Sequence, residues 1–308
     1  MRFAVIGAGG LGGYLGGRLA GAGHDVTLIA RGSHLAALRA AGLTVIGVDG
    51  AATVTPVRAT DDPTGIGAVD AVLLAVKTWQ LDEALAALPP LAGPDTAVIT
   101  VQNGVEAPHR VAQAVGRHAV MPGVAKVIAM LAGPGTVRHA GGPGALDLAE
   151  WDNRPTGRAE RIREALVGAG ITTTPPADIW ADLWAKFLFV VPSGGLGAVT
   201  DATFGVLRQR PGTRRILQAA MAEIEGLARA HGVALPADIV ARTMAFVDQQ
   251  PAEGTTSLHR DIKAGRRSEL DAWTGAVVRL GARTGTPTPV HDVIHEVLSL
   301  RESGSASA

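Results

Sequence analysis

The chain has 308 residues, of which 47% are hydrophobic, 18% charged and 4% aromatic, as in globular proteins and unlike disordered or fibrous ones. Lys plus Arg and Asp plus Glu number 28 each, so no net field attracts a polyanion, which argues against nucleic-acid or anionic-membrane partners. The chain contains no cysteine, which excludes disulfides, thiolate metal sites and cysteine nucleophiles and agrees with a cytoplasmic protein.

The first part of the chain predicts alternating strands and helices. Residues 2–6 form an apolar run, a segment long enough for three helical turns follows at 12–23, and 25–30 form a second apolar run. Unbroken apolar runs are typical of parallel strands covered on both faces. The pattern also predicts strands at 69–76 and 96–101, a helix at 81–88, a hairpin with an Asp49-Gly50 turn within 43–60, and a strand-rich stretch at 119–149. The start of the chain lacks the apolar stretch of a signal peptide, and we expect no membrane span.

The second part of the chain predicts helices only, at 178–191, 212–231, 236–248, 269–283 and 289–301. Pro175 and Pro176 mark the expected domain boundary, because two adjacent prolines favour extended backbone and lack amide donors. We therefore expect an α/β domain with a mostly parallel sheet at 1–175, an all-α domain at 176–302 and a disordered polar tail at 303–308.

A glycine cluster between the first strand and the first helix fits the pattern G-x-G-x-x-G and comprises Gly7, Gly9, Gly10, Leu11 and Gly12. In this context the first glycine allows a tight turn, the second lets a pyrophosphate approach the backbone, and the third lets the helix contact the strand. The pattern indicates dinucleotide binding. A glycine-rich turn without a ligand is the alternative.

Arg31 follows the second strand, where an NAD-specific site would carry an acidic residue. A guanidinium offers paired donors to a 2′-phosphate, and the sequence has no acidic residue between Asp25 and Asp49 to repel that group. These features favour NADP(H) over NAD(H). Arg31 could also be an ordinary solvated cation.

Lys77 and Asn103 each follow a predicted buried strand directly. Ligands of open α/β sheets lie at the carboxyl ends of the strands, so both side chains are candidates for the nicotinamide end of the site. A loop lysine and an Asn-Gly turn explain them equally well.

Six short motifs in order along nearly the whole chain resemble the ketopantoate reductases: residues 7–12, 77–80, 102–104, 183–186, 257–262 and 269–271. The resemblance implies a Rossmann domain followed by a helical domain, NADPH as hydride donor, and reduction of a 2-keto acid in the cleft between the domains. It also implies that Lys186 is the general acid, that Glu269 holds the substrate hydroxyl or the lysine, and that Ser257 contacts the substrate carboxylate. Asn103 and Lys77 would line the junction of cofactor and substrate.

Lys186 also stands out without the resemblance. Ile179, Leu183, Lys186 and Val190 follow the spacing of one helix stripe, so an ammonium occupies a position expected to be apolar. Desolvation there would lower its pKa, which suits a group that donates a proton to a developing alkoxide. The alternative is a lysine that buries its stem and keeps its charge in water.

Plainer interpretations exist for the two other candidates. Ser268 to Asp271 reads as a capping box, in which Glu269 would complement the helix dipole. Ser257 could cap a helix over 258–264. The basic residues nearby form a solvated face or attract an anionic substrate: Arg260, Lys263, Arg266 and Arg267.

The sequence departs from the family where the substrate would bind. Val190 and Gly194 stand where these reductases usually carry asparagines, and Thr274 replaces a third. Losing these donors weakens discrimination for a substrate with matching hydroxyls. Glycines 194, 195 and 197 are expected to make room for a bulkier or more apolar ketone or imine. A reductase of a different ketone or cyclic imine and a non-catalytic NADP(H) sensor are the alternatives.

Other chemistries have little support. His291 and His295 lie at i, i+4 on the last predicted helix but lack the glutamate of a zinc-protease motif, so we expect a surface helix and no metal. No G-x-S-x-G elbow is present. The expected partner is a small-molecule carbonyl substrate, and a homodimer is left open.

Overall fold

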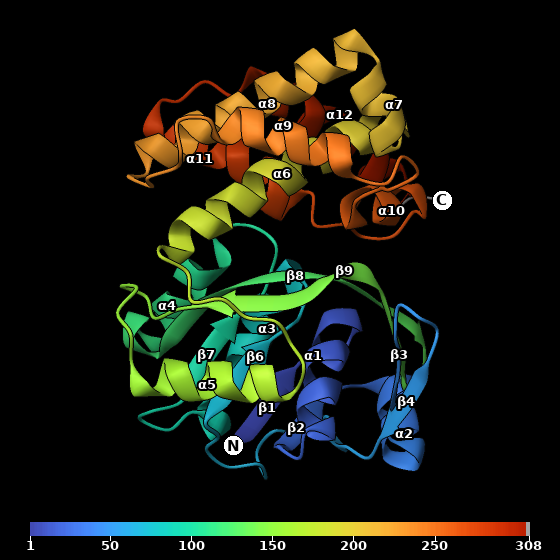
Figure 1. The fold of residues 1–308 in the computed structure, drawn as a ribbon, viewed down its shortest axis with the longest axis vertical. Coiled ribbons are helices and arrows are strands. Elements are labelled where there is room, and N and C mark those ends of the chain that lie inside the picture. The colour runs from blue at the N-terminus through green and yellow to red at the C-terminus, as the bar shows by residue number, and fades with distance from the viewer. Residues whose placement is uncertain (306–308) are drawn as a thin grey trace. The chain divides into compact units, whose positions relative to one another are not determined.

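A computed structural model describes residues 1–305 of the protein (Figure 1). The chain divides into two compact units. One contains Met1–Gln102 and Ala107–Ile179, and the other contains Asn103–Glu106 and the chain from Trp180 onward. The boundary expected after residue 175 stays a prediction.

The first unit is built on one nine-stranded sheet with the order β4-β3-β9-β8-β7-β6-β1-β2-β5. All neighbours pair in parallel except β3 with β4 and β8 with β9. This confirms the mostly parallel α/β fold. The strands are β1 Arg2–Ile6, β2 Asp25–Ile29, β3 Leu43–Ile46, β4 Ala52–Thr55, β5 Arg58–Thr60, β6 Ala71–Leu74, β7 Ala97–Thr100, β8 Val120–Gly133 and β9 Thr136–Leu148.

Helices cover both faces of this sheet (Figure 1). Phe3 and Val5 of β1 share one core with α1, α2 and α5, whereas Ala4 and Ile6 share another with α3 and α4. Alternate side chains of a strand point to opposite faces, so burial on both sides explains the unbroken apolar run. The helices are α1 Gly10–Gly21, α2 Gly32–Ala41, α3 Leu81–Ala86, α4 Ala107–Val115 and α5 Gly157–Gly168, with short 3₁₀ turns η1 Thr78–Gln80, η2 Pro89–Leu91 and η3 Arg117–Ala119.

The hairpin expected within 43–60 is present as β3 and β4, paired antiparallel. It lies at one edge of the sheet, because β3 pairs with β9 on its other side. The chain then crosses to the opposite edge, where β5 pairs in parallel with β2. Residues 58–60 are therefore a separate strand.

The second unit contains helices, which confirms the all-α prediction for this part of the chain. One helix, α6, contributes Phe187, Leu188 and Val191 to the unit's buried core. The helices are α6 Ile179–Thr200, α7 Phe204–Gln209, α8 Pro211–Ala230, α9 Ile239–Gln249, α10 Ser257–Lys263, the π-helix η4 Asp271–Gly275, α11 Ala276–Thr284 and α12 Pro289–Ser305.

Helix α6 is longer than the helix expected at 178–191, because it continues through Pro192. A proline removes only its own amide donor and crowds the carbonyl four residues earlier, and a well-packed helix tolerates that loss. Its length and mean hydropathy would also suit a membrane span. However, 67% of its most apolar stretch is buried inside the protein, as in the core helix of a globular protein.

Helix α12 continues to Ser305, three residues into the segment 303–308 that was expected to be a disordered tail. Extending an existing helix gains one hydrogen bond for each residue that is fixed, so small polar residues can continue it. Residues 306–308 lie outside the described part of the chain.

Candidate active site

The glycine-rich loop connects β1 to α1. Gly7 has φ +95°, a left-handed conformation that favours glycine, and a Cβ on Gly12 would collide with the carbonyl oxygen of Gly7. A Cβ on Gly9, in contrast, would have no atom within 4 Å. The fold itself therefore requires glycine at 7 and 12, whereas Gly9 borders open space into which a ligand can approach.

The start of α1 suits an anion. Gly9 is the N-cap, no side chain caps the helix, and the first turn contains no acidic residue. The first amides of a helix lack partners within the helix, and their dipoles favour negative charge. A pyrophosphate beside Gly9 would meet these amides, so the residues present fit a dinucleotide.

His34 holds this loop from a distant part of the chain, a role that the sequence analysis missed. Its Nδ1 accepts the amide hydrogen of Gly135 at 2.9 Å, so its Nε2 carries the hydrogen and donates to the carbonyl oxygen of Ala8 at 2.8 Å. The ring thereby links the glycine-rich loop to the turn between β8 and β9. Only its spacing three residues after Arg31 could have drawn attention to it.

Arg31 lies at the start of α2, at the carboxyl end of β2, as expected. Its Nη1 forms an ion pair with Oε1 of Glu83 at 2.5 Å, and both side chains are more than half exposed. The cation is thus accessible but already faces a carboxylate from α3.

Lys77 follows β6 and opens the turn η1. Its backbone amide donates to Oε1 of Gln80 at 3.3 Å, and its Nζ lies 5.7 Å from the centre of the Trp79 ring. The side chain of Gln102, two residues after β7, donates to the carbonyl oxygens of Leu74 and Val76 at 2.7 and 3.2 Å. Gln102 therefore fixes the strand end from which Lys77 emerges.

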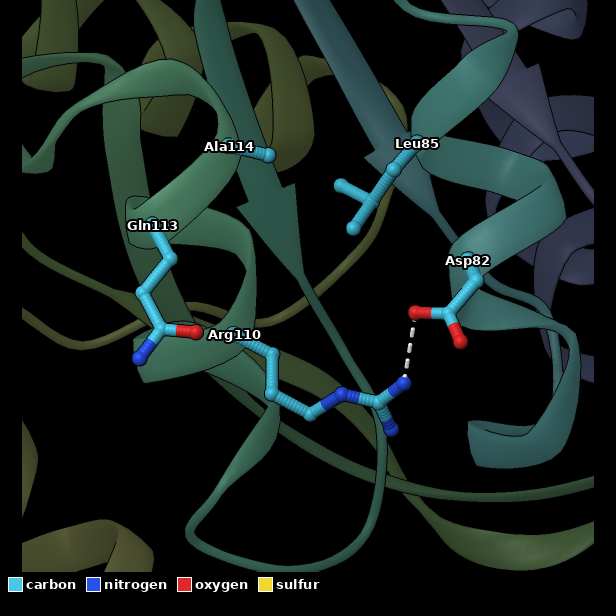
Figure 2. A pocket seen from close by; sticks show the side chains of 5 residues that line it. All are labelled: Asp82, Leu85, Arg110, Gln113 and Ala114. Carbon is cyan, nitrogen blue, oxygen red and sulfur yellow. Dashed lines mark hydrogen bonds and ion pairs between the residues drawn. The ribbon is translucent and has the colours of Figure 1, made fainter.

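A shallow polar groove lies between α3 and α4 on the same unit and is lined by Asp82, Leu85, Arg110, Gln113 and Ala114 (Figure 2). The ion pair of Asp82 with Arg110, at 2.7 Å, spans it. None of the predicted site residues lines this groove.

In the second unit, Lys186 lies on α6 as expected. Ile179 and Leu183 of its stripe are buried, while Lys186 and Val190 are half-buried. The stem of the lysine is therefore covered in part, and part of the side chain stays accessible.

Glu269 does not belong to an exposed first turn, so the capping-box interpretation is wrong for it. The residue is only 6% exposed and precedes the π-helix η4. Ser268 does accept from the amide of Leu270 at 3.1 Å, whereas Asp271 pairs with Arg279 at 2.5 Å. A buried carboxylate beside a π-helix is typical of a functional site more than of a helix cap.

Ser257 is the first residue of α10, and its neighbour Thr256 is the cap, accepting from the amide of His259 at 3.3 Å. The capping interpretation for Ser257 is therefore wrong. Arg260 lies on the same helix face at i, i+3, and its guanidinium donates to the carbonyl oxygen of Thr255 at 2.8 Å. Burial lowers the pKa of Arg260.

Three site segments meet at Gly194 of α6. A Cβ on Gly194 would lie 2.7 Å from the Trp273 ring and 3.0 Å from Oγ1 of Thr256. Trp273 lies four residues after Glu269, and Thr256 precedes Ser257, so the segments that carry Lys186, Glu269 and Ser257 converge here.

The same contacts correct the expectation that the glycines of α6 leave room for a larger substrate. A Cβ on Gly195 would contact Ile294 and Thr274, and one on Gly197 would lie 3.4 Å from the ring of His259. Protein side chains fill the space beside all three glycines, because α6 packs closely against its neighbours.

The segment Asn103–Glu106 belongs to the second unit although it follows β7. Oε2 of Glu106 accepts from Nη2 of Arg279 at 2.8 Å, and a Cβ on Gly104 would lie 3.1 Å from the carbonyl oxygen of Ala272. Asn103 is thereby held in the unit that contains Lys186, Ser257 and Glu269.

His291 is fully buried, so the expected surface position is wrong for it. Its Nδ1 lies 2.6 Å from Oε2 of Glu223, whose other oxygen accepts from the amide of Val290 at 2.7 Å. The pair anchors the start of α12. Within the part of the chain that the structure describes, no group of three or more histidine, aspartate or glutamate side chains is placed to hold a metal ion.

Two family models match the chain in succession. The model described as "Ketopantoate reductase PanE/ApbA" matches residues 3–153, and the one described as "Ketopantoate reductase PanE/ApbA C terminal" matches residues 178–302. The chain belongs to the ketopantoate reductase family. It is therefore an oxidoreductase of the kind that interconverts CH–OH and C=O groups.

Relatives match along the full length. A 2-dehydropantoate 2-reductase of Mesorhizobium japonicum is 31% identical over 96% of this chain and 95% of its own, and one of Halobacterium salinarum is 31% identical over 98% and 99%. A solved PanE/ApbA family ketopantoate reductase from Ralstonia eutropha aligns with a TM-score of 0.90 at 32% identity, over 99% of this chain and 100% of its own.

The same fold occurs in a D-mandelate dehydrogenase solved with NADH and anilino(oxo)acetate, which aligns with a TM-score of 0.90 at 23% identity, over 99% of this chain and 100% of its own. At that identity the likeness extends to the fold alone.

Proposed function

We propose that the protein is an NADPH-dependent reductase of the 2-dehydropantoate 2-reductase type, in which Lys186 is the general acid. The observation that carries the proposal is the convergence at Gly194 of the segments bearing Lys186, Ser257 and Glu269. In the proposal these segments supply a proton donor for the developing alkoxide, a hydroxyl that binds the substrate carboxylate, and a buried carboxylate that positions the reacting groups.

When bound, NADPH would supply the hydride that reduces the carbonyl carbon, which leaves a negative charge on the carbonyl oxygen. Lys186 gives that oxygen a proton from its ammonium, so the product is an alcohol and the lysine recovers a proton from water. Glu269, which is buried, holds the substrate hydroxyl or the lysine in place in this proposal.

Ser257 binds the substrate carboxylate in this proposal, together with the guanidinium of Arg260 on the same helix face. Asn103 donates to the reacting group in this proposal, and Lys77 contacts the cofactor. On the cofactor side, Gly7, Gly9, Gly10, Leu11 and Gly12 receive the pyrophosphate, and Arg31 receives the 2′-phosphate.

The preferred substrate is a 2-keto acid with an apolar substituent. The Trp273 ring contacts Gly194, where the family usually has an asparagine, and Val190 is apolar as well. A hydroxyl on the substrate would lose hydrogen bonds there, whereas an apolar group would not. A cytoplasmic location and a homodimer also belong to the proposal. A role in pantothenate biosynthesis belongs to it only if 2-dehydropantoate is among the substrates turned over.

A panel assay tests the proposal. NADPH oxidation is followed at 340 nm with 2-dehydropantoate, apolar 2-keto acids, simple ketones and cyclic imines. The proposal expects turnover of 2-keto acids and a higher kcat/KM for those with apolar substituents. Turnover of imines alone would replace it with an imine reductase, and NADPH binding without any turnover would indicate a sensor.

A further inference from the structure

The ion pair between Arg31 and Glu83 joins two crossovers of the sheet. Arg31 follows β2, and Glu83 lies in the first turn of α3, which follows β6. Because β6, β1 and β2 are adjacent and parallel, their carboxyl ends share one edge, and this brings together residues 52 positions apart. Nη1 and Oε1 lie 2.5 Å apart.

This pair changes the electrostatics expected for the ribose pocket. The sequence shows no acidic residue near Arg31, yet the fold supplies one from α3. A 2′-phosphate that binds Arg31 must displace or approach the Glu83 carboxylate, and like charges repel. A 2′-hydroxyl, in contrast, can donate to that carboxylate, as it does to the acidic residue of NAD-specific sites.

We propose that Glu83 sets the cofactor selectivity of this protein by weakening the preference that Arg31 creates for NADP(H) over NAD(H). The inference rests on the proposed function, because it assumes that the ribose binds beside Arg31. The pair is exposed, so it contributes little to stability, and removing the carboxylate leaves the fold intact.

The fold offers a matched control in the adjacent residue. Asp82 also lies in the first turn of α3 and forms an exposed ion pair, with Arg110 at 2.7 Å, across the groove of Figure 2. Asp82→Asn removes the same charge from the same helix turn without touching Arg31. If Glu83→Gln changes cofactor binding only through the helix dipole or the net charge, Asp82→Asn should change it by the same amount.

Dissociation constants measured by calorimetry test the inference without any turnover. NADP⁺, NAD⁺, 2′,5′-ADP and 5′-AMP are titrated into the wild type, Glu83→Gln, Asp82→Asn and Arg31→Met. Glu83→Gln is expected to raise the ratio of NADP⁺ to NAD⁺ affinity by about tenfold, the size of one charge interaction near a protein surface. Asp82→Asn should leave this ratio within about twofold, and Arg31→Met should lower it.

Binding of the two cofactor fragments, 2′,5′-ADP and 5′-AMP, shows which contact of the ribose changes. Tighter 2′,5′-ADP binding in Glu83→Gln indicates relief of repulsion, and weaker 5′-AMP binding indicates a lost bond to the ribose hydroxyl; either supports the inference. An unchanged or lower ratio overturns it while the proposed function stands. If the wild type binds neither dinucleotide, both fail.

Discussion

Arg279 bridges Glu106 and Asp271, with its Nη2 2.8 Å from Oε2 of Glu106 and its Nη1 2.5 Å from Oδ1 of Asp271. Burial acts to lower the pKa of Arg279, but its bonds to the two carboxylates outweigh burial and raise that pKa. One guanidinium thus fastens the segment that begins at Asn103 to the π-helix that follows Glu269.

We therefore predict that Arg279→Gln acts on catalysis more than on stability. Releasing the Asn103 segment should lower kcat/KM by ~10–100-fold, because small misplacements of positioning groups are costly. The measurement is steady-state kinetics with separate kcat and KM values, alongside urea unfolding and calorimetry with NADP⁺.

Arg279→Lys should recover part of the rate, and Arg229→Gln, which removes an exposed pair with Glu225 on α8, should have no effect. If Arg279→Gln loses only stability, with the rate per folded molecule unchanged, the positioning role is wrong.

Gly194→Ala is predicted to destabilise the protein although it lies inside a helix. Alanine gains about 1 kcal/mol of helix propensity over glycine, but overpacking a core costs about 1–3 kcal/mol. The new Cβ would lie 2.7 Å from the buried Trp273 ring. Urea unfolding should show a lower free energy of unfolding.

The control for this substitution is Gly226→Ala on α8, where the nearest atom to a Cβ is the Cγ2 of Thr286 at 3.5 Å. There the higher helix propensity of alanine acts without any cost of overpacking, and the free energy of unfolding should rise by up to about 1 kcal/mol. Stabilisation by both substitutions would show that Trp273 moves aside easily.

The glycine-rich loop yields a contrast between two substitutions. Gly9→Ala meets open space and should leave the unfolding free energy nearly unchanged, while a methyl group beside the pyrophosphate weakens NADP⁺ binding at least about tenfold. Gly12→Ala collides with the carbonyl of Gly7 and should lower stability itself by about 1–3 kcal/mol.

Calorimetry and urea unfolding on both variants separate these effects. Normal NADP⁺ binding by Gly9→Ala would place the dinucleotide elsewhere.

Asp201 should make stability depend on acid pH. Its carboxylate lies 2.8 Å from Nε2 of His259 and 2.9 Å from Nζ of Lys263, and these bonds lower the pKa of Asp201. A lowered folded-state pKa means that the contribution is present above the unfolded value of about 3.9 and is lost as pH falls through the folded value.

Asp201→Asn should therefore flatten the stability profile measured by urea unfolding between about pH 5 and pH 2. Asparagine also tolerates the positive φ of 50° at this position, so the backbone is kept. Glu253→Gln, at an exposed site, is the control. Parallel profiles for Asp201→Asn and the wild type would remove Asp201 from acid unfolding.

The local pattern of apolar residues predicted the strands that are buried on both faces and the helices that bury one apolar stripe. The apolar runs at 2–6 and 25–30 are β1 and β2, and the helical periodicity after residue 178 led to α6, α8, α9 and α12. Helices α2, α4, α5 and α7 were not predicted. Two of them, α2 and α5, begin at a glycine, Gly32 and Gly157, which reads as a turn in sequence, and each buries only a narrow stripe against the sheet.

For the candidate site as well, local sequence predicts some residues, whereas other contacts appear only in the folded structure. Residues with a short motif or an odd polarity, such as Gly9 and Lys186, are visible in sequence because their neighbours define the context. The contacts of Arg31 with Glu83 and of His34 with Gly135 join residues 52 and 101 positions apart. Strand order creates those contacts, and no local pattern encodes strand order.

The most direct test of the central claim is NADPH oxidation by Lys186→Ala with the best 2-keto acid of the panel, compared with the wild type at saturating cofactor. The account predicts a fall in kcat of ~10²–10⁴-fold, as for other general-acid losses, with the NADPH dissociation constant unchanged within about twofold. A wild-type rate in this variant would contradict it.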